Sequence, residues 1–142
     1  MSNSMSKTTI TAEAAGRVLA ACQAFASEAG SAYAICVCDE SGNPKATVRM
    51  DGAPLPSIEV AADKAYTAAG FGMPTDQWFD FVNGDDPLRL GATARIPRLV
   101  VFGGGYPLTV DGAVVGAVGV SGGHWSDDME IAKAGVEAFG NS

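Results

Sequence analysis

Residues 113–126 have the sequence AVVGAVGVSGGHWS, in which an apolar run leads through two glycines into a polar segment. The apolar part, Ala113–Ser121, predicts a buried strand, and the hydroxyl of Ser126 is placed to cap a helix that follows it. Just before the strand, Asp111-Gly112 predicts a two-residue turn of the primed type, which pairs the strand with Pro107–Val110. The stretch therefore predicts an antiparallel hairpin that runs into a helix.

The remaining elements are predicted outward from this hairpin. We expect helices at Thr11–Ala29 and Ser57–Gly70, a short third helix capped by Thr75, strands at Tyr33–Asp39, Lys45–Met50 and Leu99–Phe102, and a loop over residues 83–95. The order is α-β-β-α-α-β-β-β-α. Because hairpins dominate it, the sequence predicts an α+β fold whose mainly antiparallel sheet is flanked by helices.

Length and charge limit the classes of protein to which this chain can belong. The 142 residues suit one domain, expected over residues 10–142, behind a flexible polar leader at residues 1–9. A net charge of −7 argues against a nucleic-acid partner, because phosphates require a basic face. The longest apolar stretch, residues 113–120, is too short to cross a membrane, so no membrane partner is expected.

The cysteines favour a cytoplasmic protein. Cys22, Cys36 and Cys38 are odd in number, and they lack the further ligands that a zinc site requires. The N-terminus has no apolar segment of the kind that a secretion signal carries. We therefore expect reduced, buried thiols, no metal site and a cytoplasmic location.

His124 is the only histidine and the leading candidate for chemistry. Its unperturbed side chain titrates near neutral pH, so it can serve as general acid, general base or iron ligand. The N–H groups of Gly122 and Gly123, at the start of the following helix, are expected to hold a substrate carboxylate. The alternative interpretation is a histidine that only hydrogen-bonds to the backbone.

Further residues are candidates for the same site. Lys64 is predicted to hold a carboxylate or to act as a desolvated base, and the alternative is a structural ion pair. Arg49 and Tyr106 are expected to bind the substrate, and Asp51 or Asp63 to position the imidazole or a cation. With one histidine and no G-x-S-x-G motif, serine hydrolase chemistry is not expected.

Two other patterns have structural interpretations. The run Gly103–Gly105 lacks the lysine of a nucleotide-binding loop, so it predicts a tight turn or bulge where another backbone comes close. The aromatic residues Trp78, Phe79 and Phe81 predict core or subunit interface.

Four blocks occur in order along the chain: VRMDGAPLPSI at Val48–Ile58, DKAYTAAGFGMPT at Asp63–Thr75, VFGGGYPL at Val101–Leu108, and VGAVGVSGG at Val115–Gly123 with Asp128-x-Glu-Ile-Ala132 after it. Together they resemble the GlcG/HbpS family, a heme-binding-protein-like group that includes the C-terminal domain of PduO-type corrinoid adenosyltransferases. The resemblance runs from about residue 10 to residue 138. It implies a profilin-like (GlcG-like) fold with a five-stranded antiparallel sheet flanked by helices, assembled as a homo-oligomer.

The chain departs from the family pattern at two positions. Heme binders of the family carry a histidine in the first helix, in an Ala-His-Ala context, and the matching stretch here has Phe25. The residue after Ser-Gly-Gly is usually threonine in the family, and here it is His124. The resemblance thus implies a ligand on the first helix that this chain lacks, while an imidazole stands elsewhere.

Three functions are compatible with these residues. The one favoured from the sequence is a cofactor-independent acid–base enzyme of isomerase, hydratase/lyase or deaminase type, which acts on a small carboxylated catabolic intermediate with His124 as proton shuttle. The alternative, which the resemblance implies, is a heme (tetrapyrrole)-binding or heme-handling protein with His124 as axial ligand and with Phe25 and Tyr106 against the macrocycle. The third is an oligomeric structural protein in which His124 is incidental.

Overall fold

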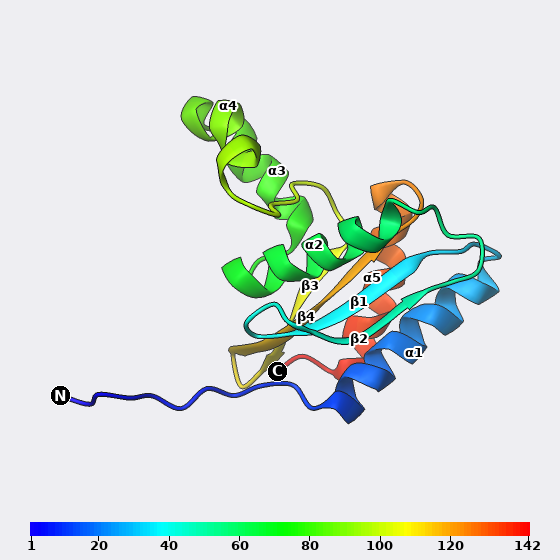
Figure 1. Cartoon of the computed structure of the whole chain (residues 1–142), viewed down its shortest axis with the longest axis horizontal. Coiled ribbons are helices and arrows are strands. Elements are labelled where there is room, and N and C mark those ends of the chain that lie inside the picture. Colours follow the sequence, from blue (N-terminus) through cyan, green and yellow to red (C-terminus); the bar gives the residue numbers. More distant parts are fainter.

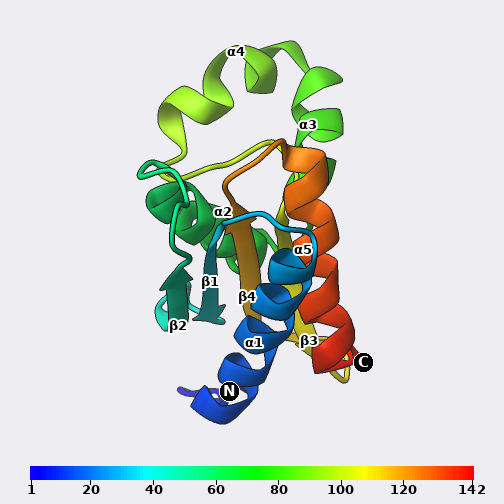
Figure 2. The ribbon, with the colours of Figure 1, turned by 90° about the vertical axis from the view of Figure 1, so that its right-hand side faces the viewer.

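Three layers make up the fold, with the sheet in the middle (Figure 2). The computed structural model describes residues 1–142. Its helices are α1 (Ala12–Glu28), α2 (Ser57–Phe71), α3 (Thr75–Asn83), α4 (Asp86–Arg95) and α5 (Trp125–Phe139), and its strands are β1 (Ala34–Asp39), β2 (Pro44–Arg49), β3 (Gly105–Val110) and β4 (Ala113–Ser121). One face of the sheet is covered by α2 and the other by α1 and α5 (Figure 1).

Strand β1 is apolar from Ala34 to Cys38 because helices cover both of its faces. Its side chains Ile35 and Val37 belong to the core shared with α1 and α5, whereas Ala34, Cys36 and Cys38 pack with the alanines of α2. A strand buried on both faces has no position for a polar side chain, which explains its continuous apolar sequence.

The sheet has the strand order β2-β1-β4-β3, and its strand pairs are antiparallel. The turn between β3 and β4 has positive φ at both central residues, 51° at Asp111 and 79° at Gly112, which confirms the predicted primed turn. At Gly119, in the middle of β4, a side chain would collide with the carbonyl oxygen of Ala61 in α2. Glycine therefore lets α2 lie directly on the central strands.

The sheet has four strands rather than the five that the resemblance implied, because the predicted strand Leu99–Phe102 does not form. Thr67 of α2 binds this segment instead: its hydroxyl accepts a hydrogen bond from the Val100 N–H at 3.1 Å and donates to the Arg98 carbonyl at 2.9 Å. Arg98 also has φ of 65°, outside the strand region. These contacts hold the segment against α2 and away from a strand partner.

The predicted loop at residues 83–95 is also wrong, since most of it forms α4. The side chain of Asp85 accepts a hydrogen bond from the Leu88 N–H at 3.1 Å, and Pro87 lies in the first turn, so the helix has a proper start. Ala92 anchors the helix by packing with Trp78 and Val82 of α3. The two helices form an arm that projects from the body (Figure 1).

The ends of the other helices agree with prediction in part. Thr11 caps α1 by accepting from the Ala14 N–H at 3.1 Å, and Gly30 follows the helix with φ of 73°, as expected. Ser57 and Thr75 do not act as caps. The Ser57 hydroxyl donates to the Pro54 carbonyl, and the Thr75 hydroxyl accepts from the Gly105 N–H at 2.9 Å, which ties α3 to β3.

Two observations bear on the cysteine and leader predictions. Cys22, Cys36 and Cys38 are free and buried, as expected. Residues 1–9 form no helix or strand. The first of them extend away from the body (Figure 1), whereas the Lys7 Nζ lies 3.9 Å from the Glu40 Oε1, and the flexibility of the segment stays a prediction. None of the helices combines the length and the apolar character that a membrane span requires.

The buried thiol of Cys22 predicts a loss of stability in alkali. Burial raises the pKa of Cys22 from 9.0 to about 12, so the folded state keeps this proton while the unfolded state releases it. The folded state then binds more protons, and the free energy of unfolding falls with rising pH, by about 1.4 kcal/mol per pH unit between about pH 9.5 and 11 for this group. Urea denaturation across this range measures the slope.

The variant Cys22→Ala isolates this contribution from the other groups that titrate in alkali. Its stability is lower at neutral pH because a core atom is missing, but its slope is expected to be shallower than that of the native chain by the amount given above. Equal slopes in the two proteins would show that the Cys22 thiol ionises as readily in the folded state as in the unfolded state.

Candidate functional site

Strand β4 passes into α5 through a tight turn at Gly122 and Gly123. Gly122 has φ of 152°, and a Cβ there would lie 3.0 Å from the Ala32 carbonyl oxygen and from the Tyr33 Cα. A Cβ at Gly123 would lie 3.1 Å from the Tyr33 hydroxyl. The two glycines thus let the turn pack closely against Ala32 and Tyr33, just before β1. This packing fixes the position of His124, the next residue.

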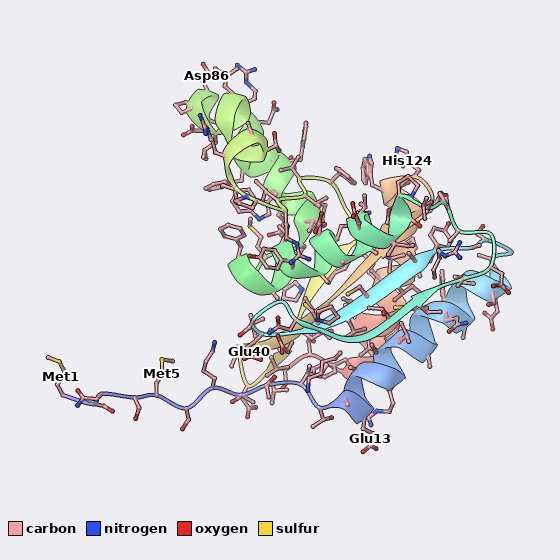
Figure 3. The ribbon with its side chains drawn as sticks, viewed as in Figure 1. Met1, Met5, Glu13, Glu40, Asp86 and His124 are labelled. Carbon is pink, nitrogen blue, oxygen red and sulfur yellow. The ribbon has the colours of Figure 1, made fainter.

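His124 caps α5 with its ring. Its Nδ1 accepts a hydrogen bond from the Ser126 N–H at 3.2 Å and lies 2.8 Å from the Ser126 hydroxyl. The predicted cap, Ser126, was therefore wrong by two residues, because the helix begins at Trp125 and an imidazole nitrogen takes the role of the hydroxyl. The ring is exposed and projects outward from the start of α5 (Figure 3), and its Nε2 makes no hydrogen bond within the chain.

Beneath this turn lies a buried ion pair between Lys64 of α2 and Asp128 of α5. Their side chains are 0% and 2% exposed, and the Lys64 Nζ lies 2.7 Å from the Asp128 Oδ2. The ammonium also donates to the Val120 carbonyl at 2.8 Å, and the Gly123 N–H donates to the Asp128 Oδ1 at 3.2 Å. Lys64 thus forms an ion pair, which is the structural alternative given for it above.

Burial and pairing act in opposite directions on these two groups. Burial lowers the pKa of Lys64 and raises the pKa of Asp128, whereas the hydrogen bond and the opposite charge of the partner favour both ionised forms.

The glycine run Gly103–Gly105, which was predicted to admit a close backbone approach, lies beside this pair and does so. A Cβ at Gly104 would lie 2.7 Å from the Lys64 Nζ, and one at Gly105 would lie 2.6 Å from the Lys64 carbonyl oxygen.

The turn that was expected to hold a substrate carboxylate therefore holds a carboxylate of the chain itself. The Gly123 N–H is bound by Asp128, and the N–H groups of Asp127 and Asp128 are bound by the His124 carbonyl at 3.0 Å each. With the Ser126 N–H on the His124 ring, the backbone donors at the start of α5 are largely used. The roles predicted for Gly122 and Gly123 in substrate binding stay predictions.

Arg49 and Asp51 come together in a different place. Both are exposed and line a pocket of about 520 Å³ between the end of α1 and the end of β2, which His124 and Lys64 do not line. Ala32 lines the same pocket and also lies against Gly122, so only this residue separates the pocket from the glycine turn. Asp63 is elsewhere, paired with Arg98 at 2.7 Å.

Two predicted aromatic residues lie apart from each other. Phe25 is on α1 and is 42% exposed. Tyr106 is half-buried in β3, and its hydroxyl is buried without a hydrogen-bond partner. Burial, with the negative charges of Asp76 and Glu130, raises the pKa of Tyr106. The sequence-predicted site residues thus occupy several places, and only Gly122, Gly123, His124 and Lys64 gather around one turn.

The sequence analysis missed a pocket of about 410 Å³ between α3, residues 101–103 and the start of α5. Its walls are mainly apolar and carry two carboxylates: Asp76, Phe79, Asp80, Val101, Phe102, Gly103, Trp125 and Met129. Trp78 and Phe79 were treated as one group, yet Trp78 is 5% exposed in the core and Phe79 is 55% exposed in the pocket wall. The available signal was their adjacency on a helix, which puts them on different faces.

Comparison with protein families decides what kind of protein carries this site. The family model described as "Haem degrading protein HbpS-like" matches residues 10–137. The chain belongs to this HbpS-like family. The resemblance to the GlcG/HbpS family is therefore confirmed, and with it the α+β fold.

Relatives of known sequence include both short proteins and a larger enzyme. An uncharacterized 15.0 kDa protein of the dhaT-dhaS intergenic region of Citrobacter freundii is 35% identical over 98% of each chain. Protein GlcG of Escherichia coli K12 is 34% identical over 81% of this chain and 83% of its own length. The corrinoid adenosyltransferase PduO of Salmonella typhimurium is 36% identical over 74% of this chain, which spans only 31% of PduO.

Solved structures share the fold closely. Protein ORFY of Klebsiella pneumoniae has a TM-score of 0.88 at 32% identity and covers 98% of this chain and 96% of its own. A double mutant of HbpS from Streptomyces reticuli has a TM-score of 0.85 at 31% identity, over 97% and 92%. A PduOC–heme complex has a TM-score of 0.84 at 30% identity, over 92% and 95%. One structural relative has therefore been solved with heme.

The buried ion pair predicts a strong asymmetry between single and double variants. Lys64→Met leaves the Asp128 carboxylate buried without a counter-charge and is expected to lower the free energy of unfolding by about 3–5 kcal/mol. The double variant Lys64→Met/Asp128→Asn, which removes that charge, is expected to be more stable than Lys64→Met alone. Urea denaturation of both proteins measures the difference.

Lys133→Met is the matched control, because its ammonium pairs with Glu130 at 3.3 Å on the exposed side of α5. That pair is screened by water, and its loss is expected to change stability by less than about 1 kcal/mol. If Lys64→Met cost no more than this control, the buried pair would not have the structural role described here.

Proposed function

We propose that this chain binds heme or a related tetrapyrrole and that His124 is the axial iron ligand. The observation that carries the proposal is the likeness to PduOC in complex with heme, which extends over 92% of this chain. The family description, which names heme degradation, supports the same class of ligand. We therefore prefer the heme alternative to the acid–base enzyme that the sequence alone favoured.

The surroundings of His124 suit an iron ligand. An imidazole that binds iron through Nε2 carries its remaining proton on Nδ1, and a hydrogen bond from that nitrogen fixes the direction of the ring. In this chain Nδ1 accepts the bond from the Ser126 N–H and lies 2.8 Å from the Ser126 hydroxyl, while Nε2 has no partner in the chain. Iron binding through Nε2 would move the ring proton to Nδ1, which would then donate to the Ser126 hydroxyl and give up the bond from the Ser126 N–H. The ring also lies 4.9 Å from the ring of Trp125 and is held beside an aromatic surface.

Heme, when bound, supplies an iron atom that takes a nitrogen ligand and a flat apolar ring that packs on aromatic side chains. In the proposal, His124 presents its nitrogen, Ser126 orients the ring, and Trp125 keeps water from one side. Of the two further aromatic residues expected against the macrocycle, Tyr106 is half-buried in β3 with its hydroxyl buried, so only Phe25 is kept in the proposal. Phe25 is available for this role because 42% of its surface is exposed.

The acid–base enzyme has less support from the geometry. Lys64, proposed as a base or carboxylate binder, is inaccessible and paired with Asp128. The hydrogen bonds of the His124 ring go to Ser126, so no carboxylate is hydrogen-bonded to the ring to orient it as a base. None of the relatives described above is named as an isomerase, lyase or deaminase.

Assembly and location belong to the same proposal. Exposed apolar side chains on the arm, Phe81 at 55% and Leu90 at 74%, support the homo-oligomer that the family resemblance implies. The three buried free thiols support a cytoplasmic location.

A hemin titration of the native chain and of His124→Asn tests the proposal. Asparagine is a good N-cap and preserves an acceptor for the Ser126 N–H, so the start of α5 is retained while the iron ligand is lost. The native protein is expected to shift the Soret band with saturation at one equivalent. The variant is expected to lose this shift and to bind hemin at least about tenfold more weakly, a difference of about 1.4 kcal/mol.

Two further measurements separate ligation from packing. Metal-free protoporphyrin IX, followed by its fluorescence, is expected to bind the native chain and His124→Asn equally, because it offers no iron. Free imidazole is expected to restore the native hemin spectrum in a His124→Gly variant. A native protein without a Soret shift, or a His124→Asn variant with the native spectrum and affinity, would contradict the assignment.

A further inference from the structure

The pocket between α3, residues 101–103 and α5 has walls and charges that are not explained by heme binding. Phe79, Phe102 and Trp125 line it and are 55%, 44% and 45% exposed, so their rings are open to a ligand. Its volume of about 410 Å³ falls within the range of small-molecule sites, about 300–1,000 Å³. A side chain at Gly103 would collide with Met129, so glycine lets Met129 and Trp125 pack closely against residues 101–103 in the pocket wall.

The charged side chains of the pocket are both acidic. Asp76 and Asp80 line it, and no lysine, arginine or histidine does. The Asp76 Oδ1 is buried and has no hydrogen-bond donor in the chain. A buried carboxylate oxygen without a donor is costly, because it has lost water and gained nothing in exchange. The negative charge of Asp76 therefore has no balancing donor or cation in the pocket wall, and a positively charged ligand fits best.

The electrostatic surroundings point the same way. The pKa of Tyr106 is raised first by burial and then by the negative charges of Asp76 and Glu130. Aromatic faces attract cations, and one of these rings already does so: the Lys64 Nζ lies 5.1 Å from the centre of Phe102. That ammonium is balanced by Asp128, so it does not neutralise Asp76 or Asp80.

We propose that this pocket binds a small organic ammonium ion with an apolar or aromatic substituent. The ammonium group pairs with the Asp76 carboxylate, Asp80 adds a second negative charge, and the apolar part lies against Phe79, Phe102 and Trp125. This site shares Trp125 with the heme proposal, but it takes a ligand of opposite charge and does not rest on that proposal. The two heme propionates are anionic, and the carboxylates of Asp76 and Asp80 repel them.

Three probes of nearly the same size and different charge test the proposal: benzylammonium, benzyl alcohol and benzoate. Isothermal titration calorimetry of the full chain at low salt measures their affinities. Because Trp78 also fluoresces, the part of the fluorescence change that is lost in Trp125→Leu reports contact with Trp125. Benzylammonium is expected to bind at least about tenfold more tightly than benzyl alcohol, benzoate is expected not to bind, and added salt is expected to weaken the binding.

Variants locate the binding. Asp76→Asn keeps the shape of the side chain and removes its charge, and it is expected to weaken benzylammonium at least about tenfold. Trp125→Leu is expected to weaken it by removing an aromatic wall. Glu137→Gln makes the same change of net charge at an exposed position of α5 outside the pocket and is expected to leave the affinity unchanged. Circular dichroism confirms that each variant is folded.

The proposal fails on any of three results. The first is that benzylammonium does not bind at concentrations up to about 10 mM, where a Kd of that size corresponds to a binding free energy of about 3 kcal/mol. The second is binding of benzyl alcohol or benzoate as tight as that of benzylammonium. The third is equal affinity in folded Asp76→Asn, folded Trp125→Leu and the Glu137→Gln control, which would place the ligand elsewhere on the acidic surface.

Discussion

The buried ion pair between Lys64 and Asp128 is the interaction on which the arrangement of this protein depends. It joins α2 on one side of the sheet to α5 on the other. The Lys64 ammonium also donates to the Val120 carbonyl, which ties the end of β4 to the pair. The glycine run before β3 leaves room for the lysine head, and the Gly123 N–H completes the shell of the carboxylate. Two buried charges are tolerated only with this full set of partners. The pair therefore fixes the positions of α2, the end of β4 and α5 relative to one another.

This pair also decides where chemistry can occur. The glycine turn and helix start would be an anion site if their donors were free, but Asp128 and the His124 carbonyl use them. Reactive groups are left on the outer side of the turn, where the Nε2 of His124 is exposed, and in the aromatic pocket beside it. The internal charge pair is thus structural, and ligand binding is assigned to the surface that it supports.

Much of the fold could be predicted from the sequence, because the caps and turns that neighbouring residues favour are the ones that the packed structure contains. The cap at Thr11 and the primed turn at Asp111-Gly112 depend on neighbouring residues alone, and both formed as predicted. Leu99–Phe102 failed as a strand, and the Thr67 hydroxyl, distant in sequence, binds its Val100 N–H and the carbonyl of Arg98 just before it. The helix at Asp86–Arg95 was missed although Asp85 and Pro87 signal its start. The partner of Lys64 lies 64 residues away, beyond the reach of any local pattern.

The single histidine makes the central claim directly measurable. Growth with ¹⁵N-labelled histidine labels His124 alone. Pulsed electron paramagnetic resonance of the hemin-loaded protein then detects whether a labelled nitrogen is bound to the ferric iron. We predict a strong ¹⁵N hyperfine coupling of the size given by a directly coordinated imidazole. A heme-loaded spectrum without that coupling would contradict the claim that His124 is the axial ligand.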